Sequence, residues 1–284
     1  ILVRPQMQGD TEYESNGKTI KYLVNEVNKD ELCSLFHELL GTAHFDRWCS
    51  HVCQGEVAPC AGLSPYSSAV FKNDSISDSL WKFTIKARIG ELYVAACTSR
   101  YFGKKNTNCR RCTSSRSQPY RETQFHVLNL CSFNEGLITR RHNELANILH
   151  QELVSLGLDA DLEVSPSEVK TRLKPDIVVR TPTHTYLIDM KSPYDMLKNF
   201  KEAREQNIKT YAGLAADMQS SSRVCTSVET FIVGALGSWD PQNNDLLKFL
   251  KVPSKRVPSL AKRMSLAALK ESYQIFNIHV AIKT

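Results

Sequence analysis

Two acidic residues and a lysine stand at spacings that can build a site for phosphodiester chemistry. The motif Lys174-Pro175-Asp176 precedes an apolar run, and Asp189-Met190-Lys191 ends a second one. If the two runs pair as a hairpin that turns at Pro182-Thr183, Asp176 lies directly opposite Asp189, with their Cβ atoms about 5 Å apart. Lys191, two residues beyond Asp189, projects from the same face of the strand. The spacing therefore predicts two carboxylates and one ammonium group at one place.

This predicted group is suited to metal-dependent hydrolysis. Two close carboxylates repel each other, and a divalent cation that prefers oxygen ligands, Mg²⁺ or Mn²⁺, relieves the repulsion. Such an ion can polarise a phosphodiester and hold a water molecule for attack. Lys191 can orient or deprotonate that water, or stabilise charge in the transition state. The alternative is a surface hairpin with ordinary charges, but the apolar flanks at 177–179 and 187–188 indicate a buried sheet, where a charge needs a reason.

A third acidic ligand is offered by a helix that the sequence predicts from Leu137 to about Leu156, before Gly157. His142, Leu145, Leu149, Glu152 and Leu156 form one stripe at helical spacing. Glu152 would then point near the sheet and could complete the acidic group. A glutamate at the exposed edge of the helix fits the same pattern.

A second constellation has the ligand types of a structural zinc site. Cys109 and Cys112 are separated by two residues, and His126 and Cys131 follow with four residues between them. Four ligands of this kind close a tetrahedral site around zinc. The segment has little apolar material to fold around without a metal, which favours zinc over a chance cluster of free cysteines. We expect ordinary thiols and histidines at the other group, whose spacing fits no metal pattern: His44, Cys49, His51, Cys53 and Cys60.

Charge is concentrated in one part of this chain of 284 residues, whose formal net charge is +6. Seven basic residues and a single acid lie between positions 100 and 126: Arg100, Lys104, Lys105, Arg110, Arg111, Arg116 and Arg121, with Glu122. Such a block indicates either a nucleic-acid footprint or a solvated charged loop. The nine cysteines, an odd number, argue against a disulfide framework. No apolar stretch reaches the ~18–20 residues that span a membrane, and the start at Ile1 suggests an excised part of a longer chain.

The elements that would position these groups form a mixed α/β region from about 135 to 284. Short strands are predicted at 173–179, 185–190 and 229–236, and helices at 196–218, 244–250 and 259–275. Upstream, helices are predicted at 28–40 and 80–96, with a linker at 55–68 and a loop-like segment at 101–134.

In this order, the motifs resemble the restriction-like endonuclease region of site-specific non-LTR retrotransposons, the group that inserts into ribosomal or spliced-leader genes. The resemblance covers about 75–284. It is carried by the helix from Leu80 to Arg88, Arg100, the Cys-Cys-His-Cys group, Arg141-His142-Asn143, Asp176, Asp189, Ile208 to Tyr211, and Gly234 to Trp239.

The resemblance implies an α/β fold, a restriction-endonuclease-like PD-(D/E)xK core with flanking helices. A zinc knuckle and a mainly helical N-terminal region would precede this core. The implied parts are the tail of a reverse-transcriptase thumb (1–75), a helical linker (76–105), the knuckle (106–134) and the nuclease (135–284). Arg141 and His142 join the basic block as candidate nucleic-acid-binding residues.

The implied activity is nicking of one target-DNA strand, whose 3′ hydroxyl then primes reverse transcription of the element's RNA. Implied partners are the target DNA, that RNA and an upstream reverse-transcriptase domain of the same polypeptide, and the implied location is nuclear. Two other functions stay open: an inactive DNA- or RNA-binding module, and a restriction or repair nuclease of the same fold.

The catalytic lysine departs from the family's pattern. Family members often carry it on the helix before a Lys-Tyr pair, whereas here Lys209 is one residue out of register. Lys191 occupies the position usual in restriction-like nucleases. Both are candidates, and the strand argument favours Lys191.

Overall fold

The computed structural model describes residues 11–15, 18–22, 29–51, 54–72, 76–103, 106–112, 120–167 and 169–281. They belong to two compact units, 1–50 and 51–284. The first unit holds an antiparallel hairpin of β1 (Thr11–Ser15) and β2 (Lys18–Tyr22), and the helix α1 (Lys29–Ser50). Across the described ranges of both units, no helix combines the length and apolar character needed to cross a membrane.

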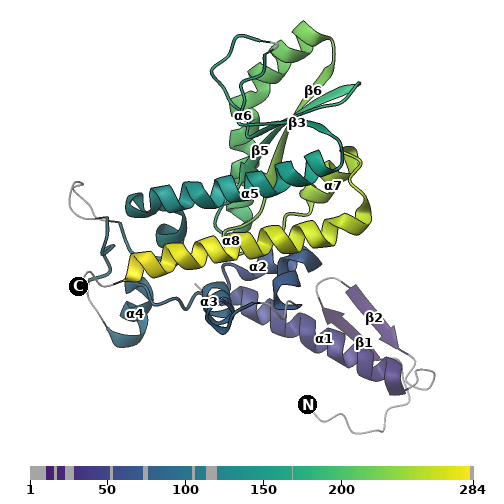
Figure 1. Ribbon diagram of the computed structural model, residues 1–284. Helices are drawn as coiled ribbons and strands as arrows, with labels where there is room; N and C mark the ends of the chain where they lie inside the picture. Colours follow the sequence, from purple (N-terminus) through teal and green to yellow (C-terminus); the bar gives the residue numbers. More distant parts are fainter. Residues whose placement is uncertain are drawn as a thin grey trace. The chain divides into compact units, whose positions relative to one another are not determined.

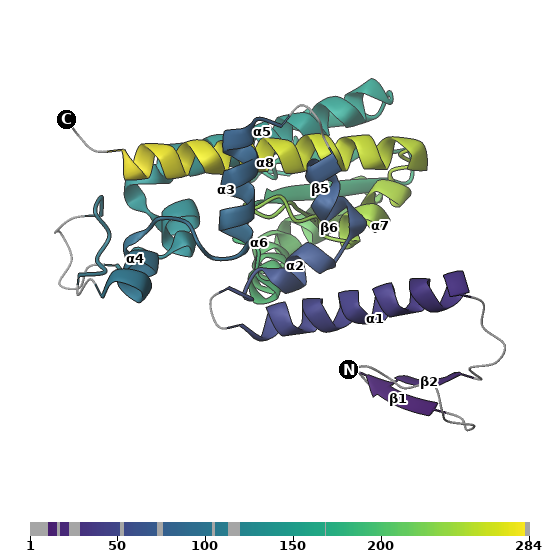
Figure 2. The same ribbon diagram turned by 90° about the horizontal axis from the view of Figure 1, so that it is seen from below.

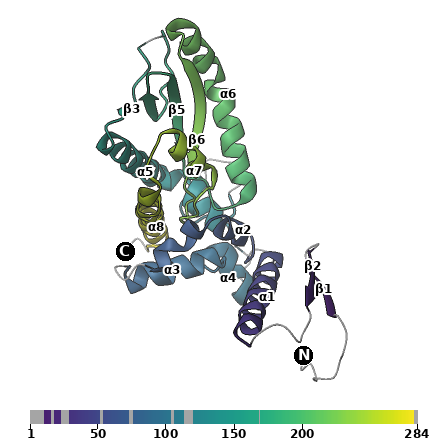
Figure 3. The same ribbon diagram turned by 90° about the vertical axis from the view of Figure 1, so that its right-hand side faces the viewer.

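A small mixed sheet forms the centre of the second unit, in the order β3-β4-β5-β6. β3 (Asp159–Leu162), β4 (Ile177–Arg180) and β5 (His184–Lys191) pair antiparallel, whereas β6 (Cys225–Ile232) runs parallel to β5. The crossover between β5 and β6 is the long helix α6 (Leu197–Ser222), which lies along one face of the sheet (Figure 3). The predicted mixed α/β class is therefore confirmed, while β3 was not predicted from the sequence.

The predicted hairpin register is confirmed. Ile177 pairs with Ile188 and Arg180 with Thr185, and continuing the register by one residue sets Asp176 against Asp189. Because side chains alternate along a strand, Asp189 shares the face of Leu187. Leu187 is buried in the cluster that packs on α6.

Three helices cover the opposite face of the sheet: α5 (Glu135–Ser155), α7 (Gln242–Phe249) and α8 (Val257–Val280). Leu149 on α5, Ile188 on β5 and Met264 on α8 belong to one buried apolar cluster. In Figure 1, α5 and α8 run side by side beneath the sheet. α8 is longer than the predicted helix at 259–275 and therefore extends beyond the sheet to the segment with the cysteines.

A second apolar cluster joins the N-terminal helices of this unit to α8. The helices and turns outside the sheet layer are α2 (Ala58–Gly62), η1 (Pro65–Lys72), α3 (Asp78–Arg88), α4 (Ala95–Phe102), η2 (His126–Leu130), η3 (Ser132–Asn134) and η4 (Ser254–Arg256). α3 lies across α8 (Figure 2), where Phe83 contacts the rings of Tyr273 and Phe276. The helix predicted at 80–96 thus ends at Arg88, and a second one begins at Ala95.

The loop from Gly234 to Trp239 is organised around a buried carboxylate. Asp195 is fully buried and accepts the backbone N–H groups of Leu236 and Ser238 at 2.6 and 3.0 Å. A Cβ atom on Gly234 would lie 2.5 Å from this carboxylate. Glycine is therefore required at position 234, which gives one of the sequence motifs a structural reason.

Candidate functional site

The carboxylate pair lies on the hairpin of β4 and β5, within reach of side chains from both α5 and α6. Asp189 is 4% exposed, and Lys191 forms an ion pair with its Oδ2 atom. This oxygen is buried, and Lys191 is its charged partner. Asp176 accepts the backbone N–H of Met190 on Oδ2 at 2.6 Å. The structure thus places the two carboxylates and the lysine together, as their spacing predicts.

His142 contributes to this group from another element. It lies on α5, and its Nε2 atom is 3.1 Å from Oδ1 of Asp176. This hydrogen bond raises the pKa of His142 and, against the effect of burial, lowers that of Asp176. His142, a candidate nucleic-acid contact by sequence, therefore holds a carboxylate. The sequence predicted that His142 faces the sheet only because it belongs to the helical stripe.

The two carboxylates titrate differently. Burial and the negative charge of Asp176 raise the pKa of Asp189 to about 6. On α6, burial and the charges of Asp189 and Asp176 raise the pKa of Tyr211 to about 12. The Tyr211 hydroxyl donates to the backbone carbonyl of Lys174 at 3.0 Å. Tyr211 therefore fixes the segment that carries Asp176, a role that the sequence did not indicate.

Lys209 lies away from this group. It is exposed on α6, whereas Asn207 and Tyr211, two residues to either side, are buried toward the sheet. A step of two residues turns a helix by about 200°, so Lys209 points from the opposite face. Of the two candidate lysines, only Lys191 contacts a carboxylate of the pair.

The prediction that Glu152 completes the acidic group is wrong. Arg256 and Arg263 hold its two carboxylate oxygens at 3.0 and 2.9 Å. Glu152 also lies ten residues after His142, about 15 Å farther along α5. The helical stripe is real, because Leu145 and Leu149 are buried in the core cluster, but only its first member, His142, reaches Asp176.

The four predicted zinc ligands converge on one point. Cys109, Cys112, His126 and Cys131 offer ligand atoms that all lie within 4.8 Å of one another. The Cys112 sulfur is 3.2 Å from Nε2 of His126 and 3.3 Å from the Cys131 sulfur. Three sulfurs and one imidazole at these separations could hold a tetrahedral metal ion. The Cys131 thiol lowers the pKa of Cys109, so the cluster favours a thiolate.

Two further buried residues, Glu122 and His279, lie beside this cluster. His279, near the end of α8, lies 3.7 Å from the Cys109 sulfur and 3.2 Å from a carboxylate oxygen of Glu122. Hydrogen bonds from His279 and Arg110 overcome burial and lower the pKa of Glu122 to about 2. Cys109, Glu122 and His279 form a further group with metal-binding side chains. Neither Glu122 nor His279 was predicted as part of a metal site. Glu122 stood out in the sequence only as the single acid of the basic block, and His279 is distant in sequence from the cysteines.

The other cysteines and histidines do not gather. Among the described residues, no metal-binding group includes His44, Cys49, His51 or Cys60. Cys60 is buried, which raises the pKa of its thiol. Cys53 lies outside the described residues.

Several basic residues predicted to bind nucleic acid make contacts within the protein. Arg110 forms a close ion pair with Glu122, and Arg111 donates to the backbone carbonyls of Ile278, His279 and Ala281 at the end of α8. Arg100 donates to the carbonyl of Gly90 at 2.9 Å. Lys104, Lys105 and Arg116 lie outside the described residues.

Arg141 is the clearest correction. Its side chain is fully buried, and burial lowers its pKa to about 10. Its guanidinium donates to the carbonyls of Leu128 and Ser192 and to the hydroxyl of Ser272. Arg141 therefore joins the cysteine segment, α8 and the loop after β5, and has no surface to offer a phosphate.

Neither comparison with known proteins assigns this chain to a family: no protein-family model matches it, and no curated protein matches it.

Proposed function

We propose that the chain is a metal-dependent DNA endonuclease with a PD-(D/E)xK core, from a site-specific non-LTR retrotransposon. The observation that carries the proposal is the buried Asp189 beside Asp176 and Lys191. Placing two carboxylates together in a protein interior is costly, and a bound divalent cation offsets that cost. A site of this kind is typical of function rather than of stability. The order of motifs along the chain supports the same activity.

In this proposal each residue has a separate task. Asp176 and Asp189 hold Mg²⁺ or Mn²⁺, which when bound polarises the scissile phosphodiester. Lys191 orients the attacking water or stabilises the phosphate charge in the transition state. His142 positions Asp176 through their hydrogen bond, and Tyr211 positions the strand entrance through the Lys174 carbonyl.

The cysteine cluster takes a structural zinc ion in this proposal. Cys109, Cys112, His126 and Cys131 have the donor set for such a site. The proposed partners are target DNA, the element's RNA and an upstream reverse-transcriptase domain, and the proposed location is the nucleus. The nick would supply the 3′ hydroxyl that primes reverse transcription.

The test is nicking of supercoiled plasmid by the purified chain. We expect conversion to the open-circular form with Mg²⁺ or Mn²⁺ and none with a chelator. Open circles that form equally well in the presence of the chelator would exclude the proposed mechanism. If the folded, zinc-loaded chain does not nick a plasmid that carries its natural target sequence, the proposed nuclease activity is excluded.

Replacing each candidate lysine with alanine should have unequal effects on the nicking rate. We expect Lys191→Ala to slow single-turnover nicking by at least about 10²-fold, a common value for one partner in such chemistry. Lys209→Ala should cost little, because Lys209 points away from the pair. Because Lys191 is also an ion-pair partner of Asp189, Mn²⁺ affinity is measured in parallel. A dead Lys209→Ala enzyme with an active Lys191→Ala enzyme would reverse the assignment.

Metal affinity should depend on pH through Asp189. Its raised pKa of about 6 means that Asp189 carries a proton below that pH, and the cation must displace it. We expect apparent Mn²⁺ affinity to rise about tenfold per pH unit up to about 6 and then to level off. Calorimetric titration from pH 5 to 8 measures this, with Asp161→Asn as the control. A flat profile across this range would contradict the raised pKa of Asp189 and the displacement of its proton by the cation.

A further inference from the structure

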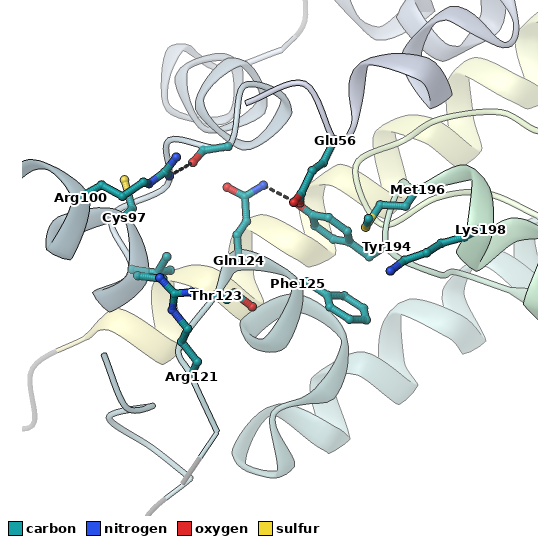
Figure 4. A pocket seen from close by; sticks show the side chains of 13 residues that line it. Glu56, Cys97, Arg100, Arg121, Thr123, Gln124, Phe125, Tyr194, Met196 and Lys198 are labelled. Carbon is teal, nitrogen blue, oxygen red and sulfur yellow. Dashed lines mark hydrogen bonds between the residues drawn. The ribbon is translucent and has the colours of Figure 1, made fainter. Parts of the chain in front are cut away.

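A pocket of about 300 Å³ lies between the cysteine segment, α4 and the loop that follows β5. Figure 4 shows Arg100 and Arg121 at one end of it and Lys198 at the other, with Phe125 and Tyr194 between them. This volume is at the lower limit for small-ligand pockets, about 300–1,000 Å³. The pocket belongs to neither the carboxylate pair nor the cysteine cluster.

The charge of this pocket favours an anion. Three cations, Arg100, Arg121 and Lys198, line it with a single acid, Glu56. Arg100 is already engaged by the Gly90 carbonyl and lies 3.9 Å from a carboxylate oxygen of Glu91. By contrast, the side chains of Arg121 and Lys198 make no ion pair or hydrogen bond within the described part of the chain. These two cations are therefore available to a ligand.

The middle of the pocket is apolar and aromatic. Phe125 and the buried Tyr194 lie with their ring centroids 5.4 Å apart, and Val94 and Met196 are further lining residues. Tyr194 is held in place by Gln124, whose amide donates to the tyrosine oxygen. A nucleic-acid base, which is a flat ring with a phosphate on either side along the strand, fits this arrangement. Stacking on an aromatic side chain does not depend on which base is bound.

The pocket is close to the carboxylate pair along the chain. Tyr194 follows Lys191 by three residues, so their Cα atoms are at most about 11 Å apart. Successive nucleotides of a duplex strand rise about 3.4 Å, and an unstacked strand is longer per nucleotide, so at most about three nucleotides separate the two places. One strand could therefore occupy both places.

We propose that this pocket binds one unstacked nucleotide of a single strand that continues into the cleavage site, with Arg121 and Lys198 on the flanking phosphates. The inference rests on the proposed nuclease function and adds the conformation of its substrate. It predicts that the protein binds DNA with unpaired nucleotides beside the cleavage site more tightly than fully paired duplex DNA.

The test is binding of a fluorescent single-stranded oligonucleotide at several salt concentrations. Two phosphate contacts on a single strand contribute about 1.4 to the log–log salt slope, about 0.7 each. We expect the double variant Arg121→Gln/Lys198→Gln to lose that contribution and to bind at least about tenfold more weakly near 0.1 M salt. The matched control Lys248→Gln/Lys270→Gln removes the same charge from α7 and α8 and should keep the wild-type slope.

Other outcomes would overturn the inference. A pocket variant that binds like its matched control, with unchanged zinc content and circular dichroism, would mean that the pocket is not a strand site. Equal competition by a free mononucleotide would indicate a small-ligand site instead. Plasmid nicking is scored separately: a pocket variant with normal strand binding and normal nicking refutes only the pocket, whereas loss of all metal-dependent nicking in the wild type refutes the nuclease.

Discussion

Asp189→Asn should abolish metal-dependent nicking while leaving the protein folded and able to bind DNA. Asparagine has nearly the same shape but removes the charge that a divalent cation needs. We expect at least about a 10³-fold loss of rate, larger than for the lysine because the metal site itself is lost. Asp176→Asn should behave alike. Plasmid nicking under single-turnover conditions, with DNA binding measured separately, gives both quantities.

The stability of this variant separates chemistry from folding. Asp189 has a folded-state pKa raised to about 6, so its stabilising contribution is present only at low pH and is lost as the pH rises through that value. At pH 8 without metal, the charged Asp189 therefore costs stability. Asp189→Asn should be at least as stable as the wild type under these conditions. Lower stability there, or retained nicking, would refute the role given to the carboxylate.

The control for both measurements is Asp161→Asn. Asp161 also lies in the sheet, on β3, but its carboxylate forms an ion pair with Arg180 at the surface. Its removal changes the net charge by the same amount as Asp189→Asn. Nicking by this variant should match that of the wild type, which excludes a general electrostatic explanation.

The local geometry of the carboxylate pair was accessible from sequence because a hairpin has few degrees of freedom. Once Pro182-Thr183 is taken as the turn, the register and the faces of the strands follow. Asp176, Asp189 and Lys191 were therefore placed together correctly. The rotation of α6 was not as well determined, although the one-residue offset of Lys209 already indicated that it would point elsewhere.

Contacts between elements distant in sequence could not be predicted in this way. The sequence predicts Arg141 as an exposed basic residue near the start of a helix, but α5 packs along α8 and buries Arg141 against Ser272. Glu152 has the correct helical phase but a position too far along the axis. His279 lacks any local motif, and only the path of α8 brings it to Cys109. Each of these outcomes depends on how helices pack, which periodicity within one segment does not specify.

Loss of metal from the cysteine cluster should loosen both this segment and the end of α8. Without an ion, three sulfurs, an imidazole and the buried carboxylate of Glu122 lie close together with no metal to hold them. Structural zinc contributes about 10–16 kcal/mol of apparent binding free energy in zinc-finger peptides. We expect Cys112→Ser to lower the free energy of unfolding by at least about 3 kcal/mol, a fraction of that figure because unfolded thiols also bind zinc.

The loss should spread to α8 through specific contacts. Arg111, next to Cys112, donates to the carbonyls at the end of α8, and His279 is buried against Cys109 and Glu122. Hydrogen exchange should therefore accelerate at 106–112, 120–134 and 275–281, and much less in β4 and β5. The matched control is Cys225→Ser, which changes an exposed thiol outside the cluster.

Two findings would contradict this account of the cluster. The first is a folded wild-type chain that contains no zinc by elemental analysis. The second is fast exchange confined to 106–112 and 120–134 in Cys112→Ser, with the end of α8 as protected as in the wild type. That result would mean that Phe83 and its aromatic neighbours on α8 hold the helix without help from the metal cluster. Spread of the exchange to 275–281 would instead show that the cluster supports the C-terminal end of α8.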